Sequence, residues 1–204
     1  MHALVESGFI TKIFSNPKGF ILNDIQYSQD IFYKWTKDEK EAIGIYEIIT
    51  DSSNFKDEAY YNNTNEEYTF TDNQVVRSWG TATPKRLEDE NAVDENGDPV
   101  LDDDGKQIIN YGLKTEKKRI IKDQASGLLA PTDWYVVKAT EVADYNVPEN
   151  ITTFRSDVRA KSNEMETQID ACNNVDELKS LYEYTKHDDG SVTRPLAEFP
   201  VLEA

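Results

Sequence analysis

Few side chains in this chain of 204 residues could build a catalytic or metal-binding site. Its two histidines, His2 and His187, are far apart in the sequence, so neither a histidine-based metal centre nor a Ser-His-Asp set is easily assembled. The single cysteine, Cys172, lies in a helical apolar pattern without a histidine base beside it. Glycine-rich phosphate loops and the Gly-x-Ser-x-Gly nucleophile motif do not occur. We therefore expect no catalytic residues, no cofactor and no bound metal ion.

A dense block of acidic residues occupies positions 84–105. Asn96-Gly97 and Asp104-Gly105 within it are strong turn dipeptides, which predicts turns rather than disorder. The alternative is a calcium site, since an EF-hand loop could start at Asp94. That loop requires glycine at its sixth position, where this chain has Pro99. We interpret the block as a solvated acidic loop.

The charge balance restricts the possible partners. The chain has 39 acidic against 22 basic residues and a net charge of -17, which would repel nucleic acid and anionic membrane surfaces. Six lysine and arginine residues between Lys106 and Lys122 reverse the sign locally. This basic run either holds the acidic block in place or binds an acidic partner, and proximity along the chain favours the first.

Composition points to a protein that depends on partners. Hydrophobic residues make up 38% of the chain and the mean hydropathy is -0.69, both low for a self-sufficient globule. No apolar run approaches the roughly 20 residues of a membrane span, and a secretory signal is not evident. We expect an elongated or partner-dependent protein that is made in the cytoplasm.

The pattern of elements predicts an α+β fold, with a small, mainly antiparallel β domain followed by a module of three to four helices. We divide the chain into a β-rich domain, an acidic turn-rich connector, a helical module and an extended C-terminal tail, at residues 1–83, 84–111, 112–185 and 186–204. In the first part, Asp72-Asn73 separates two alternating runs and predicts a two-residue hairpin turn. Thr36 and Glu39 have the spacing of a helix capping box.

The helical module is predicted from its apolar spacing. One helix starts near Leu113 and ends at Pro131, and the clearest helix covers 149–172 with one apolar stripe. The stripe favours a core position, with a docked interface as the alternative. The run Trp134–Val137 has four bulky residues in a row, which fits either a helix or a buried strand.

The stretch from Gly127 to Arg159 carries a recognisable motif. A Leu-Leu pair precedes a Thr-Asp-Trp helix start, and a Val-Pro-Glu turn then opens a helix with Phe-Arg and a second arginine four residues later. This stretch resembles the C-terminal module of bacteriophage tail assembly chaperones and of tail-fibre or baseplate accessory proteins. The resemblance favours a helix for Trp134–Val137.

Four residues of this module are candidates for partner binding. In the structural interpretation Asp133 caps a helix, Trp134 covers the helix pair, and Arg155 and Arg159 bridge to carboxylates such as Asp133 or Glu141. In the functional interpretation the two arginines meet acidic groups of a partner. Structure is favoured, because the pattern belongs to the module itself.

The C-terminal tail supplies three further candidates. Phe199, Val201 and Leu202 are apolar, and the tail's glycine and prolines argue against a helix. We expect either a segment that docks on a neighbouring subunit or a frayed terminus.

The resemblance implies a non-enzymatic structural component of a bacteriophage tail: a fibre-attachment, connector or baseplate accessory protein that acts by protein–protein docking. The alternative is a tail or tail-fibre assembly chaperone that is absent from the mature virion. The implied partners are fibre, baseplate or tube subunits, with homo-oligomerisation in a symmetric assembly and without nucleic acid or membrane. The implied location is the virion tail, after synthesis in the host cytoplasm.

Overall fold

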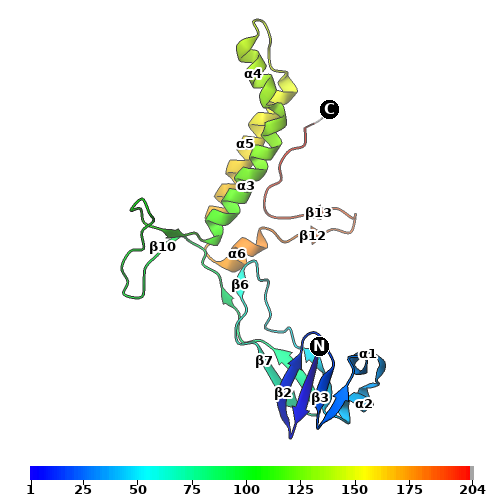
Figure 1. The fold of residues 1–204 in the computed structure, drawn as a ribbon. Coiled ribbons are helices and arrows are strands. Elements are labelled where there is room, and N and C mark those ends of the chain that lie inside the picture. Colours follow the sequence, from blue (N-terminus) through cyan, green and yellow to red (C-terminus); the bar gives the residue numbers. More distant parts are fainter. Residues whose placement is uncertain (203–204) are drawn as a thin grey trace. The chain divides into compact units, whose positions relative to one another are not determined.

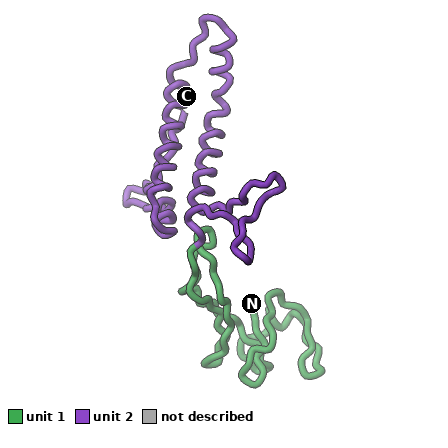
Figure 2. Tube along the Cα trace, turned by 90° about the vertical axis from the view of Figure 1, so that its left-hand side faces the viewer, with its two compact units in different colours: residues 1–84 green, residues 85–204 purple. Residues whose placement is uncertain are grey.

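The computed structural model describes residues 1–202 and separates into two compact units. Unit 1 is Met1–Pro84 and unit 2 begins at Lys85 (Figure 2). Unit 1 is a mostly antiparallel β-sheet domain curled into a half-barrel, and unit 2 is mainly helical (Figure 1). The predicted α+β fold, with strands first and helices second, is confirmed.

Unit 1 contains nine strands and two short helices within Met1–Pro84. They are β1 (His2–Glu6), β2 (Phe9–Phe14), β3 (Phe20–Leu22), β4 (Ile25–Tyr27), α1 (Ile31–Lys34), α2 (Lys37–Glu41), β5 (Ile45–Thr50), β6 (Tyr61–Asn62), β7 (Glu67–Thr71), β8 (Gln74–Ser78) and β9 (Thr83–Pro84).

A five-stranded sheet in the order β2-β1-β5-β8-β7 forms the centre of unit 1. All its pairs are antiparallel except β5 with β8, which run parallel. Successive residues of a strand face opposite sides of a sheet. Leu4 and Ile45 accordingly join one apolar cluster with Phe14, Phe20 and other side chains, whereas Ala3, Val5 and Val75 belong to a second cluster.

Two local predictions in unit 1 are confirmed. Thr71 pairs with Gln74 across the turn, and both Asp72 and Asn73 have positive φ, as a two-residue hairpin turn of this kind requires. The capping box at α2 is present: the Thr36 backbone N–H donates to Glu39 Oε2 at 2.8 Å, and the Glu39 N–H donates to Thr36 Oγ1 at 3.3 Å.

Unit 2 contains four α-helices, one 3-10 helix and two strand pairs within residues 85–202. They are β10 (Glu90–Asn91), β11 (Ile109–Asn110), α3 (Leu113–Leu129), η1 (Ala130–Thr132), α4 (Asp133–Glu141), α5 (Glu149–Asp170), α6 (Val175–Ser180), β12 (Thr185–Lys186) and β13 (Val192–Thr193).

The helices α3 and α5 lie side by side along their length (Figure 1). The predicted apolar stripe of α5 is buried, with Val158, Met165 and Ile169 fully covered. Ala125 of α3 joins Phe154 and Val158 in one cluster. The core interpretation of the stripe is therefore correct for these residues.

The C-terminal segment packs on its own chain. Leu196 is 1% exposed, and its N–H donates to the Leu181 carbonyl at 3.0 Å. The Gln168 side chain clamps the same segment: its Nε2 donates to the Pro195 carbonyl at 3.1 Å and its Oε1 accepts from the Ala197 N–H at 3.0 Å. The expectation of a frayed terminus is wrong for residues 195–197.

His2 makes the stability of unit 1 dependent on pH. Its ring is buried beside Phe32, and burial, followed by the nearby Lys40 charge, lowers the pKa of His2 below the ordinary value of 6.5. The unfolded chain therefore binds more protons than the folded chain below about pH 6.5, and the free energy of unfolding must fall as the pH falls. His2→Phe should flatten this dependence below about pH 6.5. Urea unfolding followed by tryptophan fluorescence measures it, since Trp35 and Trp79 both lie in unit 1.

The matched control for His2→Phe is His187→Gln, which removes the other histidine from an exposed position in unit 2. This variant should keep the wild-type slope for unit 1. Equal slopes in the wild-type and His2→Phe proteins would contradict the assignment to His2.

Candidate protein-docking site

Helix α4 carries an apolar surface that the chain itself does not cover. None of its residues is buried, and three large apolar side chains face solvent: Trp134 is 51% exposed, Val136 41% and Val137 52%. Val142, directly after the helix, is 46% exposed. The ambiguous run Trp134–Val137 is thus a helix, as the resemblance implied, and not a buried strand.

The expectation that Trp134 covers the helix pair is wrong. Its ring lies against Tyr135, with 4.0 Å between the ring centroids, and Lys138 Nζ lies 5.5 Å from its centre. Half of the side chain remains in contact with solvent because α4 projects beyond the seam that α3 and α5 share (Figure 1).

The turn into α4 is held by polar contacts rather than by a helix cap. Pro131 lies in η1, where its missing N–H costs no hydrogen bond, so α3 ends at Leu129 as predicted from the proline. Thr132 is 2% exposed, and its hydroxyl donates to the Leu129 carbonyl at 2.7 Å. The cap position belongs to Thr132 and has no side-chain cap, so the predicted capping role of Asp133 is wrong.

Arg155 of α5 links this turn to the second helix of the pair. Its guanidinium donates to the Leu129 carbonyl at 3.1 Å and to the Thr132 hydroxyl at 2.5 Å, and it forms an ion pair with Asp133 at 2.8 Å. Only 11% of the Arg155 side chain is exposed. The expected pair with Asp133 is present, and Arg155 is a structural residue of the turn.

Arg159, one helical turn later, behaves differently. It is exposed and donates to the Arg155 carbonyl at 3.0 Å, and no carboxylate among residues 1–202 lies within ion-pair distance of it. The expected bridge from Arg159 to Asp133 or Glu141 is absent. Its positive charge is therefore available to a partner.

A groove of about 470 Å³ runs between these groups. It is lined by Val136, Val147, Thr152, Arg155, Ser156 and Arg159. Val136 and Val147 provide apolar walls, the Thr152 and Ser156 hydroxyls can hydrogen-bond to the backbone of a partner, and the Arg159 guanidinium can donate to a carboxylate. This combination suits an apolar side chain of a protein segment that carries an acidic neighbour.

The predicted tail residues divide between core and surface. Phe199 is partly buried against the cluster of Ala125, Phe154 and Val158, so it completes the helical core of its own chain. Val201 is 85% exposed and Leu202 38%. Both of the latter line a second groove beside the start of α5, of about 500 Å³.

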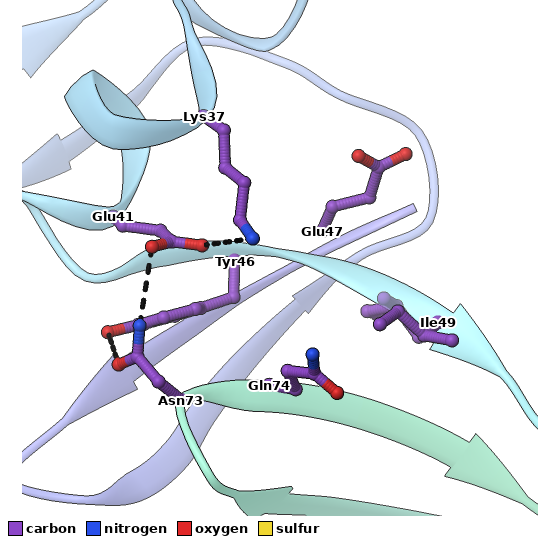
Figure 3. A pocket seen from close by; sticks show the side chains of 8 residues that line it. Lys37, Glu41, Tyr46, Glu47, Ile49, Asn73 and Gln74 are labelled. Atoms are coloured by element: carbon purple, nitrogen blue, oxygen red, sulfur yellow. Dashed lines mark hydrogen bonds and ion pairs between the residues drawn. The ribbon is translucent and has the colours of Figure 1, made fainter.

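Unit 1 has a smaller pocket of about 290 Å³, next to α2 and the β7–β8 turn (Figure 3). The polar side chains there bind one another: Lys37 pairs with Glu41 at 3.6 Å, Tyr46 donates to Asn73 Oδ1 at 3.1 Å, and Asn73 Nδ2 donates to Glu41 at 3.3 Å. This network fastens the turn to α2 and β5, which is a structural task.

Possible metal ligands and the single cysteine are the other reactive groups of the chain. Within residues 1–202, no group of three or more His, Cys, Asp or Glu side chains is arranged to hold a metal ion. Cys172 is buried, and that burial raises the pKa of its thiol. No helix in the same range is long and apolar enough to cross a membrane.

Arg155→Met should reduce the free energy of unfolding of unit 2 by about 2–4 kcal/mol, because the buried Thr132 hydroxyl loses the guanidinium that donates to it and the Leu129 carbonyl loses one of its two donors. The ion pair contributes little to this loss, since Asp133 is 61% exposed. Arg159→Met is the matched control, and its exposed side chain predicts a change of about 0.5 kcal/mol or less. Denaturant melts followed by circular dichroism measure both variants, and equal losses would contradict the division of roles.

Comparisons with protein-family models, with curated proteins and with solved structures gave no match. The functional argument therefore depends on this chain's own residues. Its strongest elements are the uncovered apolar surface of α4, the unpaired Arg159 beside it, and the motif from Gly127 to Arg159.

Proposed function

We propose that this chain is a non-enzymatic structural component of a bacteriophage tail, in which it attaches a fibre or serves as a connector or baseplate accessory protein. It acts by docking on other tail proteins through the surface of α4 and the groove beside it. The observation that carries the proposal is a helix whose tryptophan and valines are 41–52% exposed and none of whose residues is buried.

The chemistry of this surface supports docking over other uses. Exposed apolar side chains on a helix none of whose residues is buried typically mark an interaction site. Tryptophan and arginine are the residue types that most often dominate binding energy at interfaces, and Trp134 and Arg159 supply one of each. Arg159 adds selectivity, because its free charge favours a partner segment with a carboxylate.

The phage context comes from the resemblance of Gly127–Arg159. That resemblance names fibre, baseplate or tube subunits as the partners and the virion tail as the location. The same motif is shared with assembly chaperones, which bind such subunits transiently and are absent from the finished particle. A chaperone would use the same α4 surface. The two roles therefore differ in whether the chain stays in the finished particle, and not in the chemistry of its contacts.

Quantitative mass spectrometry of purified phage particles distinguishes the two roles. A structural component should be present at a fixed ratio to the major tail protein, at a multiple of three or six copies that matches tail symmetry. Presence in the infected-cell lysate together with absence from particles would contradict the structural role and favour the chaperone. Absence from both would contradict the tail role itself.

Trp134→Ala should cost less than about 1 kcal/mol in the free energy of unfolding of the isolated protein, because half of the ring is already in water. Phe154→Ala serves as the comparison, since Phe154 is 7% exposed and a buried aromatic loses about 3–5 kcal/mol on truncation. Denaturant melts measure both. A loss for Trp134→Ala as large as that for Phe154→Ala would show that the ring belongs to the core.

Val137→Asp should reduce the copy number in particles by about tenfold while the isolated protein keeps its melting temperature, because it places a charge among the exposed apolar side chains of α4. Val192→Asp is the matched control, since Val192 of β13 is 53% exposed and lies outside this surface. Incorporation of Val137→Asp at the wild-type copy number would contradict the proposal that α4 docks on other tail proteins.

A further inference from the structure

The acidic segment contains an eight-residue structural repeat. Residues 93–99 and 101–107 each form a small hairpin arm, closed by the bridges Val93–Pro99 and Leu101–Gln107. The turns of the two arms match: in each, an Asp side chain at the start accepts two backbone N–H groups, and a glycine with positive φ follows. The pair β10–β11 forms a third arm, so residues 90–110 make a three-armed junction (Figure 1).

The centre of the three-armed junction has near-threefold symmetry. Ala92, Val100 and Ile108, eight residues apart, form a closed ring of backbone hydrogen bonds. Ala92 N–H donates to Ile108 O at 2.8 Å, Val100 N–H to Ala92 O at 2.9 Å, and Ile108 N–H to Val100 O at 2.9 Å. Gln107 Nε2 lies within 3.1 Å of all three carbonyls, which fixes the centre.

An apolar side chain follows each central residue at an equivalent position. Val93 is 58% exposed, Leu101 54% and Ile109 42%. Because neighbouring side chains of an extended backbone alternate between faces, all three lie on the face opposite to the central side chains. Because the near-threefold rotation relates their positions, Val93, Leu101 and Ile109 form one ring around the axis of the junction.

The tips of the two free arms are acidic. The first tip carries Asp94, Glu95 and Asp98, and the second Asp102, Asp103 and Asp104, with Lys106 the one basic residue among positions 92–108. Two copies placed face to face would bring these like charges together, which disfavours a second copy of this chain as the occupant. A partner with basic groups around an apolar centre is complementary in both respects.

We propose that the three-armed junction docks on the end of a homotrimeric protein, at its threefold axis, where the partner presents apolar side chains ringed by lysine or arginine. A ring of three equivalent contacts on one chain matches three identical subunits without breaking their symmetry. One copy of this chain then binds one trimer. This inference rests on the proposed function in one respect only, that the chain docks on other proteins.

The test uses the full chain, affinity-tagged, as bait in lysates of phage-infected and of uninfected host cells. A captured protein is identified, purified and mixed with the chain, and the complex is weighed by native mass spectrometry. We expect one copy of this chain for three of the partner.

The binding should depend equally on the three apolar side chains, as a ring of equivalent contacts demands. Each of three substitutions should weaken it by about tenfold or more: Val93→Asp, Leu101→Asp and Ile109→Asp. Binding should also weaken as NaCl rises, because the acidic tips face basic groups.

Val192→Asp adds the same charge at an exposed valine outside the three-armed junction and should leave the dissociation constant unchanged. All substituted positions are exposed, and unchanged thermal melts verify that each variant folds. A partner ratio other than one to three, binding that ignores the three substitutions, or failure to capture any protein overturns the inference. A trimer captured only from uninfected cells would agree with the proposed role of the three-armed junction and would contradict the proposed role in a phage tail.

Discussion

The buried apolar stripe of α5 is the interaction on which unit 2 depends. Val158, Met165 and Ile169 are fully covered by other parts of the same unit, and each such side chain contributes about 1.5–3 kcal/mol through burial. The helix α3 packs along this stripe, and Phe199 of the C-terminal segment completes its cluster. Helix α4 follows this pair, and its apolar side chains Trp134, Val136 and Val137 stay 41–52% exposed.

Charge contacts secure the ends of this seam. At one end Arg155 joins α5 to the turn before α4. At the other end Lys114 of α3, which is 8% exposed, donates to the Asp170 carbonyl at 3.0 Å and pairs with Glu88 of the acidic segment at 2.5 Å. The basic run therefore holds part of the acidic segment locally, as proximity along the chain suggested. A buried ammonium with two acceptors avoids the cost of an unpaired charge.

Local chemistry made much of the fold predictable. The Asp72-Asn73 turn, the capping box at Thr36 and the helix break at Pro131 each depend on residues within a few positions of one another, so the sequence shows them directly. The α5 stripe was equally clear from its spacing.

Long-range packing was the part that sequence could not supply. The spacing of Trp134 did not reveal that half of this residue stays exposed. Nothing local marked Leu196 as buried, because the hydrogen bonds that hold its segment come from Gln168 and Leu181, elsewhere in the sequence. Among the candidate site residues, the sequence identified the Arg155–Asp133 pair but could not separate Arg155 from Arg159. The eight-residue repeat carried a usable signal, since Asp and Gly recur at Asp94, Gly97, Asp102 and Gly105.

The sheet topology of unit 1 also has a kinetic consequence. Strand β1 pairs with β5, with His2 opposite Glu47, and β5 pairs in parallel with β8. Neither pair is a hairpin, so each requires strands that are distant in the sequence to meet. Both pairings close long loops, since they join residues far apart in the sequence, whereas the pairs β1–β2 and β7–β8 are hairpins whose strands follow one another directly. The two hairpins should therefore form first during the folding of unit 1, and the joining of β1 to β5 and of β5 to β8 should be its slow step.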